Sequence, residues 1–116
     1  MTLRSIAGSC RLQFDFLRRM SCAYWVKNGD DVVSIIVRKP VEQSDSFKVD
    51  SVAKEAVCEA ESVANAVSRE CGARVIKAGS FMSNRGRRFE MVGTVDLEYV
   101  PNMVGAMSRM NVLEAI

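Results

Sequence analysis

The stretch DSVAKEAVCEAESVANAVSRECG, residues 50–72, is the segment around which we expect the rest of the chain to be organised. Its apolar residues recur at i, i+3, i+4 and i+7, which is the spacing of one buried stripe on an α-helix. Asp50 or Ser51 can accept hydrogen bonds from the first free N–H groups, and Gly72 can adopt the left-handed conformation that ends a helix. The sequence therefore predicts a helix over residues 50–72 with one buried face.

The composition is that of one globular domain. Of the 116 residues, 48% are hydrophobic and 26% are charged, and the formal net charge is +2. A chain of this length can bury a single hydrophobic core. The charge is uneven, because residues 1–29 and 73–90 each have a net charge of +4 while residues 50–72 have −3. We expect one α+β domain over residues 20–116 and a basic arm over residues 1–19.

The arm combines four arginines and one acidic residue with several large apolar residues. An Arg-rich, acid-poor start is typical of an organellar targeting segment, but it also suits an ordered arm that packs on this domain or on a neighbour. Whether the functional unit begins at Met1 or at Met20 stays open. No apolar run approaches the roughly 18 residues of a membrane span, so no such span is expected. The candidate interface residues are Leu12, Phe14, Phe16, Leu17, Tyr24 and Trp25.

The four cysteines, at positions 10, 22, 58 and 71, form no CxxC pair, and the chain has no histidine. Cys58 and Cys71 lie on the same predicted helix, about 20 Å apart at 1.5 Å per residue, so they cannot share a metal ion or a disulfide. We interpret the cysteines as reduced and mostly as small hydrophobes. This favours an intracellular, reducing compartment, cytoplasmic or mitochondrial. No metal and no cofactor are expected.

A β-hairpin is expected before the long helix. The apolar runs 22–26 and 32–37 flank Asn28-Gly29, and Asn-Gly between two apolar runs is the strongest short-range signal for a hairpin. The second run is apolar at both parities, which is typical of a central strand covered on both faces. Pro40 is expected to end this strand, because proline cannot donate a ladder hydrogen bond.

Two more strands are expected after the helix. Residues 73–82 are rich in Val, Ile and Phe, and Gly79 within them suggests a bulge or a close backbone approach. After a turn at residues 83–87, residues 88–99 alternate between apolar and polar side chains, which predicts a strand with one face in water.

The end of the chain is expected to add a short helix and an edge strand. Pro101 is a favoured helix start, and Asn111 is a plausible stop. Methionines 103, 107 and 110 form a stripe that more often belongs to a core than to an interface. Residues 112–116 would then form the last strand.

From residue 32 onward the expected order is strand, long helix, two-stranded hairpin, short helix and strand. This is the βαββαβ order of the ferredoxin-like superfold. Right-handed crossovers place two helices on one face of a four-stranded antiparallel sheet, with strands 32–37 and 88–99 in its centre. The predicted class is therefore an α+β ferredoxin-like sandwich with an N-terminal arm and an extra hairpin strand. The plan, including Gly72-Ala73-Arg74-Val75 before the second strand, resembles ACT regulatory domains and ribosomal S6-like proteins.

The motifs of common catalytic sites are missing from the sequence. There is no histidine, no phosphate-binding loop, no GxGxxG and no HExxH. Glu55 and Glu59 lie at i and i+4, but on the polar face of the predicted helix such carboxylates are normally solvated. No base accompanies a cysteine nucleophile. We therefore do not expect an enzyme.

The most specific polar feature is the arginine-rich turn at residues 84–88. Three arginines and a glycine can approach a phosphate backbone and donate bidentate hydrogen bonds to it. An RNA-binding sheet normally also exposes aromatic side chains, whereas Phe89 and Tyr99 have the predicted core-facing parity. A solvated hairpin tip is the alternative. The candidate anion-binding or RNA-binding residues are Arg74, Lys77, Asn84, Arg85, Arg87 and Arg88.

Three functions remain open. The favoured one is a non-catalytic assembly module, a homodimer or a subunit of a larger complex, that uses the edge strands 73–82 and 112–116 and the apolar segment 12–25. The second is RNA binding through Arg85, Arg87 and Arg88, with an affinity that falls with salt. The third, implied by the ACT resemblance, is a small-ligand regulatory domain.

Overall fold

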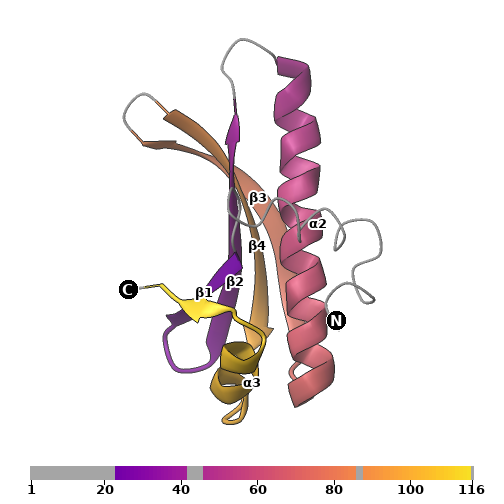
Figure 1. Cartoon of the computed structure of the whole chain (residues 1–116), viewed down its shortest axis with the longest axis vertical. Helices are drawn as coiled ribbons and strands as arrows, with labels where there is room; N and C mark the ends of the chain where they lie inside the picture. Colours follow the sequence, from indigo (N-terminus) through magenta and orange to yellow (C-terminus); the bar gives the residue numbers. More distant parts are fainter. Residues whose placement is uncertain (1–22, 42–45, 86–87, 116) are drawn as a thin grey trace.

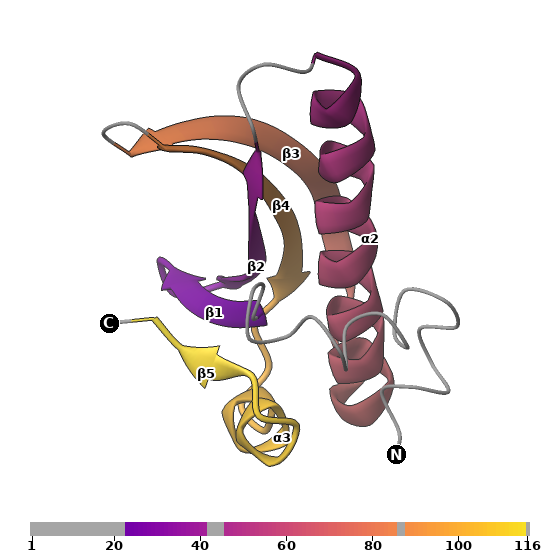
Figure 2. The ribbon, with the colours of Figure 1, turned by 45° about the horizontal axis from the view of Figure 1, so that its top comes forward.

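The computed structural model describes residues 23–41, 46–85 and 88–115 (Figure 1). The elements are, in chain order, β1 (Ala23–Asn28), β2 (Val32–Val41), α2 (Ser46–Cys71), β3 (Val75–Arg85), β4 (Arg88–Glu98), α3 (Met103–Arg109) and β5 (Leu113–Glu114). The class is α+β, as predicted. The long helix α2 lies along one face of the sheet, and the short helix α3 lies near one end of it (Figures 1 and 2).

The sheet has five strands in the order β3-β4-β2-β1-β5. Neighbouring strands are antiparallel except β1 and β5, which are parallel. The sheet is therefore mixed and five-stranded. It includes the expected extra hairpin strand, β1, but it differs from the expected four-stranded antiparallel arrangement. The difference arises because the tight β1–β2 turn keeps β1 beside β2, so the last strand pairs with the outer side of β1. As predicted, β2 and β4 are interior strands and β3 and β5 are the edges.

The predicted hairpin is confirmed. Asn28 pairs with Val32 across the turn, and Gly29 has φ = +72°, the left-handed conformation that glycine adopts without strain. The prediction that Pro40 ends β2 is wrong, because Pro40 pairs with Glu90 inside the strand. The described part of β1 accompanies β2 only as far as Val37. Beyond Val37, β4 is the only described strand that pairs with β2, so the other side of β2 makes no ladder hydrogen bond with the described residues and accepts a proline.

Helix α2 begins at Ser46, four residues before the predicted start. No Gly or Pro interrupts residues 46–49, and Ser46 is itself a residue type found at helix starts. The predicted end is confirmed. Gly72 has φ = +73°, and its N–H donates to the carbonyl of Ser68 at 2.7 Å, which closes the last turn.

Helix α2 lies against the sheet at Gly93 of β4 with no room for a side chain. A Cβ atom at this position would lie 2.4 Å from the carbonyl carbon of Ala56 and 2.6 Å from the nitrogen of Val57. The sequence prediction placed such an approach, or a bulge, at Gly79. Neither is seen there among the described residues, since none of their atoms lies within 4 Å of a Cβ at Gly79, and the irregularity in β3 falls between Val75 and Lys77.

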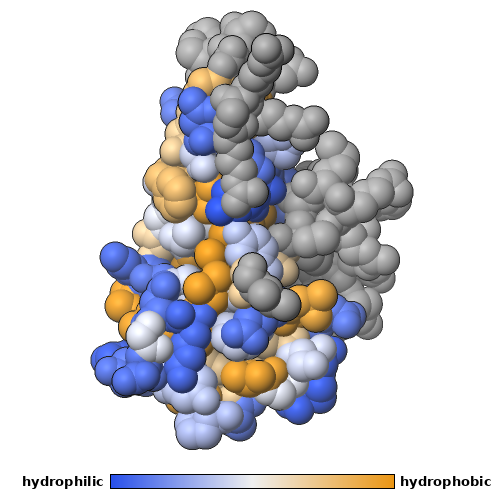
Figure 3. Space-filling model, turned by 90° about the vertical axis from the view of Figure 1, so that its left-hand side faces the viewer, coloured by the Kyte–Doolittle hydropathy of each residue, from blue (hydrophilic) through white to orange (hydrophobic). Residues whose placement is uncertain are grey.

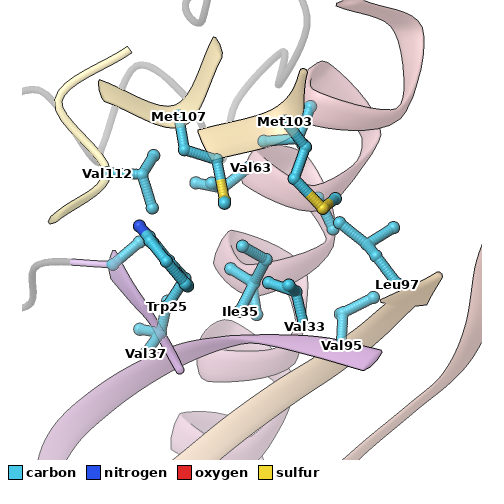
Figure 4. Close-up of a cluster of buried hydrophobic side chains, with 14 of the residues drawn as sticks. Trp25, Val33, Ile35, Val37, Val63, Val95, Leu97, Met103, Met107 and Val112 are labelled. Atoms are coloured by element: carbon cyan, nitrogen blue, oxygen red, sulfur yellow. The ribbon is translucent and has the colours of Figure 1, made fainter. Parts of the chain in front are cut away.

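The core lies between the sheet and the two helices (Figure 4). It is built from branched side chains of the inner strands and small side chains of α2, and both helices contribute to the same cluster. Met103 and Met107 of α3 are completely buried, which confirms the methionine stripe as core. Helix α3 ends before Asn111, whose φ of +61° confirms the predicted stop.

Candidate functional site

Strand β3 presents a long free edge. It is 11 residues long, and among the described residues only β4 pairs with it. Four large apolar side chains along it are exposed: Val75 by 40%, Ile76 by 46%, Phe81 by 53% and Met82 by 43%. A long edge strand with unpaired backbone groups and apolar side chains is a template for pairing with another polypeptide.

A groove of about 310 Å³ runs beside this edge, between β3 and the flank of α2. Its lining residues are Ala53, Lys54, Val57, Cys58 and Glu61 of α2 and Ser80 of β3. We call it the β3 groove. Helix α2 approaches the sheet at β4, where Gly93 meets Ala56, and among the described residues only β4 pairs with β3. A strand that paired with β3 would lie in this groove and contact both elements.

The opposite edge of the sheet, formed by β5, offers a much shorter backbone for pairing with another strand. Strand β5 has two residues, and Leu113 within it is 66% exposed. The N–H of Ala115 donates to the carbonyl of Trp25 at 2.9 Å, which ends the pairing with β1. So short a strand gives few backbone groups for a further strand to pair with. Of the two predicted edge strands, β3 is therefore the candidate site.

The sheet face turned away from α2 carries polar side chains that bind one another. The hydroxyl of Ser34 donates to Asp96 Oδ1 at 2.6 Å and accepts a hydrogen bond from the amide of Asn28. These contacts link neighbouring strands and hold their register. On this side of the molecule, polar and apolar side chains are interspersed (Figure 3).

A second polar group on that face is centred on Arg38. Its Nε donates to the hydroxyl of Tyr24 at 2.7 Å, and its Nη1 donates to Glu90 Oε1 at 3.1 Å. The hydrogen bond to Tyr24 is the main cause that raises the pKa of Arg38 above its ordinary value, so the guanidinium stays charged. Tyr24, a predicted interface residue, is thus half-buried and engaged within the sheet.

The other predicted interface residues lie elsewhere. Trp25 is 5% exposed and packs in the core against residues of β2 and α3 (Figure 4). The parity of β1 accounts for its position, because Ala23 and Trp25 point to the helix side while Tyr24 and Val26 point away. Leu12, Phe14, Phe16 and Leu17 lie outside the described residues.

The predicted anion-binding residues do not converge on one point. Arg74 precedes β3, whereas Asn84 and Arg85 lie at its far end, roughly 30 Å away along the strand. Arg74 lies 3.8 Å from a carboxylate oxygen of Glu98, and Lys77 pairs in register with Asp96. Arg88 pairs in register with Arg85, and Arg87 lies outside the described residues. The basic residues are therefore spread along β3 and the start of β4, beside acidic side chains of β4.

A buried ion pair beneath α2 was missed by the sequence prediction. Lys39 of β2 contacts Glu59 of α2, and their side chains are 8% and 3% exposed. Glu55 lies 3.6 Å from the same ammonium and is 44% exposed. The prediction that both glutamates are solvated is wrong for Glu59. A possible signal was the parity of Lys39, which matches that of the buried Val33, Ile35 and Val37.

The cysteines differ from the prediction in part. Cys71 is a free thiol, but Cys58 is disulfide-bonded, so the interpretation of all four cysteines as reduced is wrong for Cys58. The expectation of a reducing compartment loses that support.

Cys71 should react slowly with alkylating reagents near neutral pH. Partial burial, and then the neighbouring Glu70, raise the pKa of its thiol above the ordinary value. Less thiolate is therefore present at a given pH, and the thiolate is the nucleophile. We expect iodoacetamide to modify Cys71 more slowly than glutathione at pH 7.5, with a rate that still rises above pH 9. A rate equal to that of glutathione would contradict the burial seen here.

The described residues contain no group of His, Cys, Asp and Glu that could hold a metal ion. Neither described helix combines the length and the apolar composition that a membrane span requires. Comparison with known proteins found no match, whether to a family model, to a curated protein or to a solved structure.

Proposed function

We propose that this protein is a non-catalytic assembly module that binds an extended strand of another polypeptide along the free edge of β3. The observation that carries the proposal is the 11-residue edge strand with Phe81 and Met82 exposed on its two faces. Main-chain hydrogen bonds to such an edge supply affinity, and pockets for alternate side chains supply specificity. The adjoining β3 groove can accept the side chains that point toward α2 from a strand bound to β3.

We further interpret the sheet as a ferredoxin-like sheet into which β1 is inserted. From β2 to β5 the elements follow the βαββαβ order, and omission of β1 from the strand order leaves β3-β4-β2-β5. Because β5 is parallel to β1 and β1 is antiparallel to β2, β5 runs antiparallel to β2, as that plan requires. Inserting one strand moves β5 outward and leaves the β3 edge unchanged.

The alternative functions have less support. RNA binding is disfavoured by the spread of the basic residues and by Glu90, Asp96 and Glu98 on the neighbouring strand, since carboxylates repel phosphates. A small-ligand domain is disfavoured by the open, shallow form of the β3 groove, because ligand sites normally enclose most of their ligand.

Phe81→Lys is expected to disrupt assembly and leave the fold intact. Phe81 is 53% exposed, so the change should alter the free energy of unfolding by less than about 1 kcal/mol. A lysine on an edge strand opposes further pairing, and the loss of the apolar contact should weaken association by at least about tenfold. The measurement is the native mass by light scattering, together with hydrogen exchange of the β3 amides.

Leu113→Lys on β5 is the matched control, since it makes a similar change on the other edge strand. We expect the wild type and this control to exceed the monomer mass in low and in high salt, with slow exchange in β3. If the 260/280 nm absorbance ratio of the purified protein indicates bound nucleic acid, and 1 M salt removes that nucleic acid, RNA binding would be favoured instead. A monomer whose β3 amides exchange as fast as in Phe81→Lys would contradict the proposal.

A further inference from the structure

We propose that the polypeptide that occupies the β3 groove is a second copy of this chain. This inference rests on the proposed function and adds the identity of the partner and its geometry. The two β3 strands would pair antiparallel about a twofold axis, so that the two sheets continue into each other. The two α2 helices would then lie side by side on one face. In such an interface the same patch must be complementary to itself.

The flank of α2 that lines the groove is complementary to itself. Lys54, Val57 and Glu61 lie at i, i+3 and i+7, and therefore on one face of the helix, with the apolar residue between a cation and an anion. A twofold axis beside Val57 places Lys54 of one copy opposite Glu61 of the other, and the reverse pair forms by symmetry. Among the described residues, neither Lys54 nor Glu61 forms an ion pair, so both charges face the groove unpaired.

The sequence of β3 is also complementary to itself about Ser80, which lines the same groove. Antiparallel pairing centred on Ser80 places Phe81 opposite Gly79 of the second copy and Met82 opposite Ala78. Each large exposed side chain would then lie over a small one. The two Lys77 residues would be about 20 Å apart along the strands, more than a Debye length at physiological salt, so their repulsion is largely screened.

A single twofold axis can produce both the contacts between the α2 helices and the pairing of the β3 strands. Helix α2 ends at Cys71 and the chain returns into β3 at Val75. The midpoint between Lys54 and Glu61 lies about 20 Å from the helix end at 1.5 Å per residue. Ser80 lies about 17 Å from the start of β3 at roughly 3.3 Å per residue. Both centres are therefore at the same level of the molecule, which explains why both line one groove.

The spacing of the helices suits charged contacts. Helix α2 meets the sheet at Gly93 of β4, one strand in from the edge. Across the joined sheet, the two helices would thus be separated by about three strand spacings, roughly 14 Å. Helices in close apolar contact lie about 8–10 Å apart. The remaining space is bridged by long side chains such as Lys and Glu, not by the small residues that α2 places against the sheet.

The test is a charge exchange in the full chain, with the dimer dissociation constant measured by analytical ultracentrifugation. Lys54→Glu and Glu61→Lys each place like charges together twice across the axis, and each should raise the dissociation constant about tenfold or more. The double variant Lys54→Glu/Glu61→Lys restores both pairs and should return to within a few fold of wild type. A mixture of the two single variants should form a heterodimer in preference to either homodimer.

Arg69→Glu is the matched control, because Arg69 is on the same helix but does not line the groove. This variant should leave the dimer dissociation constant unchanged. If the protein is a dimer with slow hydrogen exchange in β3, but the charge variants have the dissociation constant of the wild type, this inference is overturned and the proposed function stands. A monomer with slow exchange in β3 would overturn both proposals, because a segment of the same chain would then occupy the edge. A monomer with fast exchange in β3 would contradict both proposals.

Discussion

Gly93→Ala should lower the free energy of unfolding by about 3 kcal/mol or more, at the upper end of what overpacking costs. The added Cβ would lie 2.4 Å from the carbonyl carbon and oxygen of Ala56. Backbone atoms cannot rotate away as a side chain can, so α2 must shift from β4 and lose part of its packing. The measurement is urea denaturation, in which the midpoint falls while the slope is retained.

Gly105→Ala makes the same substitution in α3 and serves as the control. In the described part of the chain, a Cβ at Gly105 meets the end of the Arg109 side chain, at 3.5 Å, and no other atom within 4 Å. Alanine has a higher helix propensity than glycine, so the free energy of unfolding of this variant should rise by about 0.5–1 kcal/mol. If Gly93→Ala were as stable as Gly105→Ala, the close approach of α2 to β4 would be wrong.

Glu59→Ala should cost about 3–5 kcal/mol of stability, because it leaves the buried ammonium of Lys39 without its main partner. The Lys39 side chain is 8% exposed, and Glu55, the remaining carboxylate, lies 3.6 Å away and is half exposed. Truncating one member of a buried pair leaves an uncompensated charge in the interior. Chemical denaturation of the variant against wild type measures the loss.

Two further variants separate the buried charge from the loss of contacts. Glu55→Ala removes an exposed partner of the same lysine and should cost less than about 1 kcal/mol. The double variant Lys39→Met/Glu59→Met replaces both charges by apolar groups and should be near neutral or more stable than wild type. A double variant as unstable as Glu59→Ala would show that the ion pair itself carries the stability.

Both features position the candidate site. Gly93 allows α2 to lie directly on β4, and the pair of Lys39 with Glu59 ties the same helix to β2. Together they fix α2 over β4 and β2, and the flank of α2 nearest β3 lines the β3 groove. We therefore expect Gly93→Ala to impair association as well as folding, whereas Phe81→Lys impairs association alone.

Local signals in the sequence were sufficient for most of the elements. The apolar stripe and Gly72 predicted the course and end of α2, Asn28-Gly29 predicted the hairpin, and alternation over residues 88–99 predicted the strand β4. The face of β4 that was expected in water is only partly exposed, and Val92 on it is buried. Each of these signals depends on the backbone preferences and periodicity of neighbouring residues, which a short segment carries by itself. The free edge of β3 followed from the predicted order of elements.

Only the tertiary structure decided how these elements meet. The insertion of β1 between β2 and β5, the burial of Glu59 against Lys39 and the position of Trp25 in the core depend on residues far apart in the chain. The close approach fell at Gly93 and not at Gly79, because it depends on which strand α2 lies over. Likewise, the sequence indicates only that Lys54 and Glu61 are charged residues on the polar face of a helix. The tertiary structure shows that both line a groove beside β3. Periodicity within a segment indicates which side chains face inward, but it does not indicate which distant segment they meet, and the β3 groove is formed by such packing.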